Sequence, residues 1–188
     1  MDGQPMTYKR TAAQKAHDFA NARQYEEHVE AVIGVPVHSR FNAKDDLDLW
    51  HPGYFIEIKE KNQPLSARWH IIDGADERNL FVMDELTVRR ACKWYPEVFF
   101  LLRDNAHDSK LPKEERQPRL FLAPIWELIS VERARLDRGK KGKWVLDLSG
   151  FTRLASEADI PEIAHHMIIN QAHKVSHCVA GDVPQVQS

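Results

Sequence analysis

Two short alternating segments around a His-Pro-Gly tripeptide at 51–53 constrain the fold of this chain most strongly. Proline fixes φ and glycine permits a positive φ, and a tight chain reversal needs both properties. The segments on either side, 46–50 and 54–61, alternate apolar and polar side chains with the period of a β-strand. The stretch 46–61 therefore predicts a β-hairpin.

Alternation places the acidic side chains of each predicted strand on the face that its aliphatic residues do not use. In the first segment, one side carries Leu47 and Leu49, and the other carries Asp46, Asp48 and Trp50. In the second, one face carries Tyr54, Ile56 and Ile58, and the other carries Phe55, Glu57, Lys59 and Lys61.

The acids and the lysine at one end of this hairpin predict a cation site. If both faces of the sheet are covered, the carboxylates repel or desolvate one another unless a cation lies among them. Glu57 and Lys59 lie side by side, roughly 7 Å apart along the strand, and the hairpin can fold Asp48 back toward Glu57. Two carboxylates, a backbone carbonyl and water form a hard oxygen site suited to Mg²⁺. The alternative is an exposed edge hairpin whose charged residues form a solvated face.

A lysine beside such an ion can position, or help to deprotonate, a water that attacks a phosphate. The run Asp48…Glu57-Ile58-Lys59 resembles the signature of the PD-(D/E)XK nuclease superfamily. In that superfamily an Asp on one strand is followed, after a short hairpin, by an acid, any residue and Lys on the next. Leu47 stands where the family usually has Pro, and a register with Asp46 as the ligand would keep the same face.

The upstream segment 24–34 is similar to the first helix of the archaeal Holliday-junction-resolvase branch. That helix carries an acid with apolar residues three, six and seven positions later. Glu26 has Val29, Val32 and Ile33 at those places. The resemblance covers about residues 19–61, with some support as far as 98–102.

The resemblance implies a metal-dependent DNA endonuclease that hydrolyses phosphodiester bonds with Mg²⁺ or Mn²⁺. By this resemblance Asp48, Glu57 and the Ile58 carbonyl bind the metal, Lys59 positions the water, and Glu26 holds a metal-bound water or a second ion. It favours branched DNA as substrate and a homodimer, since paired incisions need paired sites. Two alternatives stay open: a restriction- or repair-type duplex endonuclease, and a non-catalytic nucleic-acid-binding or assembly protein that keeps the fold.

Residues near the hairpin provide candidate nucleic-acid contacts. Arg40 and Lys44 precede it, Lys61 ends it, and Gln63 and Arg68 follow it. These residue types bind phosphate oxygens in nucleic-acid complexes. The alternative for each is a solvated surface side chain.

The remaining pattern predicts an α/β fold, a mixed central β-sheet flanked by helices, and the resemblance implies that its core is restriction-endonuclease-like. A continuous apolar run at 98–102 is typical of a strand buried on both faces. The other expected elements are helices at 13–33, 80–94, 125–134 and from 155 or 161 to 174, and strands near 71–72, 120–124 and 144–148. The charged segment 103–119 predicts a mobile surface loop.

Bulk properties favour one domain over residues 1–188, which the resemblance implies is nuclease-like, with its core at about 13–150 and a C-terminal helix and tail at 151–188. The net charge of −2 means that any nucleic-acid surface is a local concentration of cations. Two widely separated cysteines lead us to expect a reducing, cytoplasmic setting. No apolar run approaches the ~18 residues of a membrane span.

Overall fold

The computed structural model describes residues 10–34, 47–66, 69–108, 111–112, 115–131, 133–138 and 141–180. Its first helix, α1 (Ala12–Ile33), begins with a capping box. The side chains of Thr11 and Gln14 each accept a hydrogen bond from the backbone amide of the other residue. The helix ends at Gly34, whose φ of 70° is the left-handed conformation common at helix ends. The helix predicted at 13–33 is confirmed.

The predicted hairpin is present as β1 (Leu49–His51) and β2 (Tyr54–Lys61), which pair antiparallel with Leu49 opposite Ile56. Gly53 in the turn has a φ of 99°, which a residue without Cβ adopts at no steric cost. One prediction of side-chain direction is wrong. Leu47 precedes β1 and packs with Phe55, on the opposite face of the sheet from Leu49. Strict alternation begins only where strand pairing begins.

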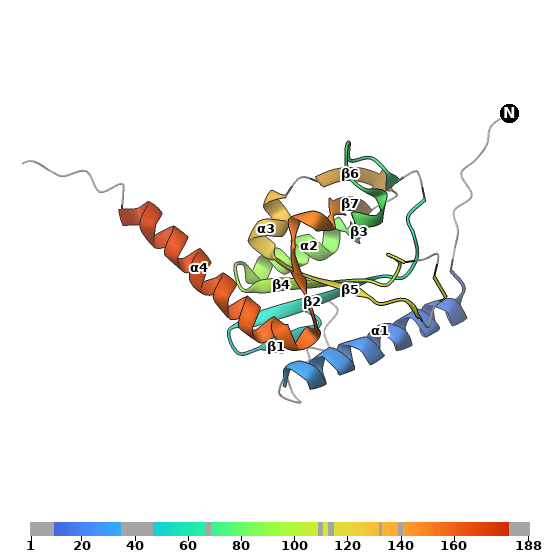
Figure 1. Cartoon of the computed structure of the whole chain (residues 1–188), viewed down its shortest axis with the longest axis horizontal. Coiled ribbons are helices and arrows are strands. Elements are labelled where there is room, and N and C mark those ends of the chain that lie inside the picture. The colour runs from blue at the N-terminus through green and yellow to red at the C-terminus, as the bar shows by residue number, and fades with distance from the viewer. Residues whose placement is uncertain are drawn as a thin grey trace, which may run out of the picture.

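The hairpin forms one edge of a five-stranded sheet with the order β1-β2-β4-β5-β8. β4 (Val98–Asp104) runs parallel to β2, whereas β5 (Arg119–Pro124) and β8 (Thr152–Leu154) continue the sheet in antiparallel pairs. All of Val98 to Leu102 is fully buried, as its apolar run predicts. The sheet is therefore mixed, and helices cover both of its faces (Figure 1). The predicted α/β class with a mixed central sheet is confirmed.

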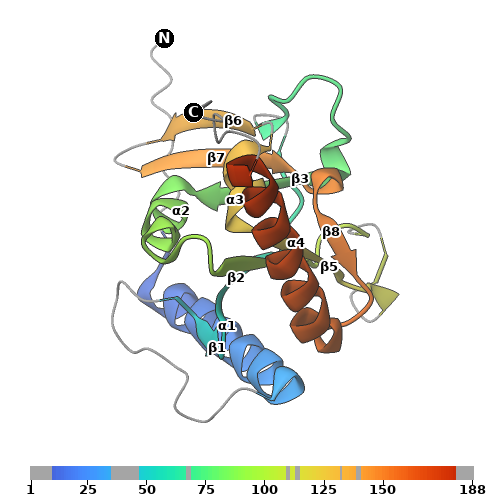
Figure 2. The same ribbon diagram turned by 90° about the vertical axis from the view of Figure 1, so that its left-hand side faces the viewer.

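Two hydrophobic clusters lie on opposite faces of this sheet. On one face α1 and the start of α4 (Ile160–Ala180) cover the sheet through Tyr25, Val29 and Ile160. On the other face lie α2 (Glu85–Ala91) and α3 (Ile125–Ser130), and beyond them a second sheet (Figures 1 and 2). Alternate residues of β4 face the two clusters, so this strand joins the two halves of the core.

The second sheet has three strands in the order β3-β7-β6 and corrects several sequence predictions. β3 (Leu80–Asp84) takes the first part of the segment predicted as a helix at 80–94, and only α2 and a short 3-10 turn follow it. β6 (Arg133–Arg138) begins where the helix predicted at 125–134 was expected to end. Residues 80–84 pair with β7 (Lys141–Asp147), which follows β3 by about 60 residues. This pairing makes them a strand although their local sequence pattern is mixed.

Other local differences are smaller. Ile71 and Ile72 lie in bends and turns, not in a strand. Short 3-10 helices cover Glu77–Asn79, Cys92–Trp94, Leu148–Gly150 and Glu157–Asp159. The segment 103–119 is not a surface loop throughout, because Asp104 ends β4 and Arg119 begins β5, and both side chains are buried. Within the described ranges, no helix has the length and apolar character needed to span a membrane.

Candidate active site

Asp48 and Glu57 come together because β1 and β2 fold against each other. The backbone amide of Ile58 donates to Oδ2 of Asp48 at 2.6 Å, which fixes the carboxylate of the first segment against the second strand. Glu57 lies beside this contact and is only 7% exposed. The two acids therefore converge at the inner edge of the hairpin, as the sequence predicts.

The Lys59 ammonium lies between these acids. Nζ is 2.5 Å from Oε1 of Glu57 and 3.8 Å from Oδ2 of Asp48, and it donates to the Ile58 carbonyl at 2.8 Å. The three groups predicted to bind a metal ion thus surround one positive charge, that of Lys59. They are the carboxylates of Asp48 and Glu57 and the carbonyl of Ile58. Such an arrangement offers oxygen ligands to a cation, with the lysine immediately beside it.

Burial and charge both shift proton equilibria here. Burial raises the pKa of Glu57 to about 7, the charge of Asp48 adds to that shift, and Lys59 opposes it. Burial alone would lower the pKa of Lys59, but the carboxylates of Glu57, Asp48 and Glu26 outweigh burial and raise it. Lys59 is therefore a cation at neutral pH and can donate hydrogen bonds from all its ammonium hydrogens.

A cleft of about 440 Å³ opens between α1 and the end of β2, and Ile58 and Lys59 of this group line it. Glu26 lines it from α1 with a side chain that is 20% exposed and lies 3.8 Å from the guanidinium of Arg23. Its charge raises the pKa of Lys59, so it faces the same site across the cleft. The structure therefore places Glu26 near the other predicted catalytic residues, on a separate element.

The metal ligands are not preassembled as a cluster of three side chains. Within the part of the chain that the structure describes, no three His, Cys, Asp or Glu residues are grouped closely enough to hold an ion. The convergent donors are two carboxylates, of Asp48 and Glu57, and one backbone carbonyl. This hard oxygen set matches Mg²⁺ or Mn²⁺ and not the nitrogen and sulfur ligands typical of zinc.

The predicted nucleic-acid contacts have different positions. Gln63 is exposed and lines the cleft. Lys61 is only 8% exposed, and its ammonium donates to Asp104 at 3.3 Å and to the Arg78 carbonyl at 3.2 Å. We therefore leave Lys61 out of the proposed nucleic-acid surface. Arg40, Lys44 and Arg68, and the alternative ligand Asp46, lie outside the described residues.

A second, larger cleft of about 850 Å³ adjoins the first, and the sequence interpretation did not include it. The two clefts share residues of α1 and of the segment after β2: Asp18, Asn21, Glu60, Asn62 and Gln63. The available sequence signal was a polar stripe on the first helix, since Asp18, Asn21, Tyr25 and His28 recur at helical spacing. This stripe faces the clefts, so the helix both packs on the sheet and forms a wall of the candidate site.

Comparisons with known proteins give one match. No protein-family model matches the chain, and no curated protein matches it. Among solved structures, a nuclease from a fusselovirus is similar over 84% of this chain and 93% of its own, with a TM-score of 0.39 and 11% sequence identity. Because this TM-score is low, we derive function from the side chains of this chain alone.

Proposed function

We propose that this chain is a metal-dependent nuclease of the PD-(D/E)XK type that hydrolyses phosphodiester bonds in DNA. The supporting observation is that Asp48, Glu57 and the Ile58 carbonyl enclose the Lys59 ammonium at the edge of an open cleft. A buried, raised-pKa carboxylate beside a lysine in a cleft is characteristic of a functional site.

The donor set fits Mg²⁺ or Mn²⁺, which Asp48, Glu57 and the Ile58 carbonyl would hold. When bound, the ion would supply positive charge that stabilises the pentacoordinate phosphorus of the transition state. Cation binding would also relieve the repulsion between the two carboxylates, which otherwise favours protonation of Glu57. Binding a divalent ion is therefore electrostatically favourable for these carboxylates.

The chain's own side chains would orient the reactants. Lys59 donates hydrogen bonds in the cleft and would position the water that attacks phosphorus. As the new P–O bond forms, the attacking water gives up a proton to solvent. The bond to the leaving sugar oxygen breaks, and that oxygen takes up a proton from solvent. Glu26, on the facing wall of the cleft, would accept a hydrogen bond from water on the other side of the reacting group.

Within this class we propose a structure-selective endonuclease similar to Holliday-junction resolvases, acting as a homodimer. The feature that supports it is the helix with Glu26, which packs on the sheet through Val29 and Ile33 and directs Glu26 toward Lys59. A restriction- or repair-type enzyme uses the same site on duplex DNA. A non-catalytic binding protein would keep the fold and lack hydrolysis.

These alternatives separate in one cleavage experiment. The protein is incubated with Mg²⁺ and supercoiled, linear duplex, single-stranded or four-way DNA, alongside Asp48→Ala and Lys59→Ala. Asp73→Ala is a matched control, because Asp73 is an exposed acid outside the site. We expect wild type and the control to cut, and the two site variants to be inactive.

Each other outcome has a definite meaning. Cleavage that survives both site substitutions refutes the proposed site. DNA binding without cleavage favours the non-catalytic alternative. Symmetric cutting of the four-way substrate in preference to a matched duplex supports the resolvase-like sub-class, and the reverse preference supports the restriction or repair type.

A further inference from the structure

A third cavity, of about 540 Å³, lies toward the opposite edge of the same sheet and is lined by two arginines. Arg119 on β5 and Arg153 on β8 line it, together with His107 and Asp108 from the segment after β4. None of these residues belongs to the candidate active site.

The strand register places the two guanidinium groups on one face of the sheet. Arg153 pairs directly with Phe121, and Arg119 precedes Phe121 by two residues on the same strand. The Arg119 guanidinium lies 5.5 Å from the centre of the Phe121 ring. Both arginine side chains therefore start from the same face of the sheet, and both line the cavity.

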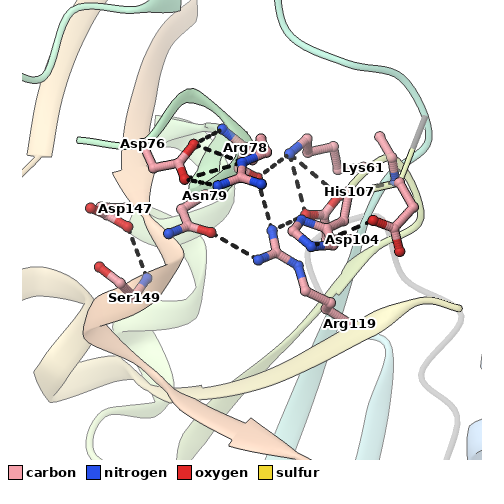
Figure 3. A network of polar contacts seen from close by, with 11 residues as sticks. Lys61, Asp76, Arg78, Asn79, Asp104, His107, Arg119, Asp147 and Ser149 are labelled. Carbon is pink, nitrogen blue, oxygen red and sulfur yellow. Dashed lines mark hydrogen bonds and ion pairs between the residues drawn. The ribbon is translucent and has the colours of Figure 1, made fainter. Parts of the chain in front are cut away.

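The buried charges beneath this cavity do not balance. Lys61, Asp104 and Arg119 stand directly opposite one another on three neighbouring strands (Figure 3). Asp104 is fully buried and accepts from Arg119 Nη2 at 2.6 Å and from Lys61 Nζ at 3.3 Å. One carboxylate thus serves two cations. With all three groups ionised the cluster carries one excess positive charge, and burial lowers the pKa of Lys61.

Arg119 also has an unused donor. Its two terminal nitrogens donate to the Asn79 side chain and the Arg78 carbonyl, each at 2.8 Å, but Nε is buried and has no partner among the described residues. The side chain as a whole is only 9% exposed. The acid that lines the cavity, Asp108, lies 3.7 Å from the imidazole of His107. An anion in the cavity would lie beside Arg119, whose buried Nε–H is unpaired, and beside the exposed side chain of Arg153.

The cavity also continues the path of the active-site cleft. The first two clefts share five residues, among them Asn62 and Gln63, and the second cleft shares Pro118 with the arginine-lined cavity. The three hollows therefore follow one another along the end of β2, β4 and β5. A strand held at Lys59 and passing Asn62 would therefore reach Arg119 and Arg153 through adjoining hollows.

We propose that the cavity between Arg119 and Arg153 binds a phosphate group of the nucleic-acid strand that continues from the active-site cleft. This assignment rests on the proposed nuclease function and names a second, non-catalytic contact for its substrate. Arginine suits this contact because its planar group offers several donors to phosphate oxygens at once. The contact would fix the direction of the strand without reading its sequence.

The test is equilibrium binding of fluorescently labelled single-stranded DNA to the full chain in chelator, so that catalysis cannot contribute. Arg153→Ala removes an exposed cation at the cavity, and Lys93→Ala removes an exposed cation on the short helix after α2. We expect Arg153→Ala to weaken binding by about five- to tenfold. The slope of log affinity against log salt should also fall by about one. Lys93→Ala should bind like wild type.

Strand length and phosphate source provide the remaining comparisons. A dinucleotide is too short to span the three hollows, so Arg153→Ala should cost it less affinity than it costs the long strand. The Arg119 Nε–H resonance should shift on adding the long strand. Equal affinity and salt slope for Arg153→Ala and wild type with the long strand overturns the proposal. A resonance that shifts with inorganic phosphate and not with the strand overturns the assignment to a nucleic-acid backbone.

The same measurements separate this inference from the proposed function. If Mg²⁺-dependent cleavage is absent but Arg153→Ala weakens strand binding, the phosphate site stands and the catalytic proposal fails. If cleavage requires Lys59 but Arg153→Ala and wild type bind alike, the catalytic proposal stands and the phosphate site fails.

Discussion

The backbone amide of Ile58 donates to the Asp48 carboxylate at 2.6 Å, so one predicted metal ligand is held by the backbone of another. This contact couples the geometry of the candidate site to the register of the hairpin. A slip of one residue would turn Glu57 and Lys59 to the opposite face and would remove the amide from Asp48. The site and the hairpin are therefore one structural unit.

The first prediction separates the structural role of Asp48 from its chemical role. Asp48→Asn keeps an oxygen that can accept from Ile58, whereas Asp48→Ala leaves that amide without its partner. We expect Asp48→Ala to lower the free energy of unfolding by about 1–3 kcal/mol, with Asp48→Asn close to wild type. Both should lose nuclease activity by at least about 100-fold, because a metal-ligand charge is absent. Urea unfolding and a cleavage assay measure the two effects, and a fully active Asp48→Asn would contradict the assigned role.

The second prediction concerns Glu57 and pH. Its pKa is raised from 4.5 to about 7 in the folded chain, so the folded state binds this proton more tightly than the unfolded state. The free energy of unfolding should therefore fall as pH rises through this window, by up to about 3 kcal/mol from this group. Glu57→Gln cannot titrate and should lack that part of the slope. Urea unfolding in chelator, comparing the two proteins at each pH, gives the difference.

Mg²⁺ provides the control for that measurement. Above the pKa of Glu57 the ion should raise the thermal midpoint of wild type, because it binds only the folded arrangement of ligands. It should leave Glu57→Gln nearly unchanged. Parallel pH slopes for both proteins would show that Glu57 is not the titrating group.

The third prediction is that loss of Lys59 separates metal binding from hydrolysis. Lys59→Met removes the ammonium from among the oxygens of Glu57, Ile58 and Asp48 and fills similar space. Mn²⁺ should bind this variant at least as tightly as wild type, since the competing positive charge is gone. Cleavage should fall by about 100- to 10,000-fold. Calorimetry with Mn²⁺ measures the first effect, and a variant that loses metal affinity and activity together would contradict this division of roles.

The fourth prediction tests the buried charge cluster at the ends of β2, β4 and β5. Asp104→Asn leaves Lys61 and Arg119 buried without their shared negative charge. We expect the free energy of unfolding to fall by about 3–5 kcal/mol. Asp76→Asn removes an exposed acid paired with Arg78 and should change stability little. Equal effects of the two substitutions in chemical unfolding would mean that burial does not strengthen the Asp104 contacts.

The hairpin, the first helix and the buried strand were predictable from sequence because each is encoded by adjacent residues. Alternation around Gly53 fixes the hairpin, and the apolar run beginning at Val98 fixes the central strand. The proximity of Glu57 and Lys59 follows from the same local pattern. Asp48 precedes β1, where alternation does not hold, and it reaches them through the hydrogen bond from the Ile58 amide. Glu26 required one further step, the packing of α1 on the sheet, which its spacing with Val29 and Ile33 indicates.

The second sheet and the charge cluster were not predictable in the same way, because their partners are far apart in the chain. β3 is stabilised by pairing with β7 about 60 residues later, and no local window contains that information. The charged pattern of residues 103–119 predicts a loop that includes Asp104 and Arg119. Their position in the sequence does indicate the contact between them. Each directly adjoins a buried apolar strand, and opposite charges on neighbouring strands can pair across a sheet.

The most direct test of the account is a crystal of the chain soaked in Mn²⁺ and measured for anomalous scattering. We predict an ion within bonding distance of the Asp48 and Glu57 carboxylates and the Ile58 carbonyl, with the Lys59 ammonium moved aside from these oxygens toward the cleft. A protein that cuts DNA with Mn²⁺ while its ion lies elsewhere, with Lys59 still bonded to Glu57, would contradict the account.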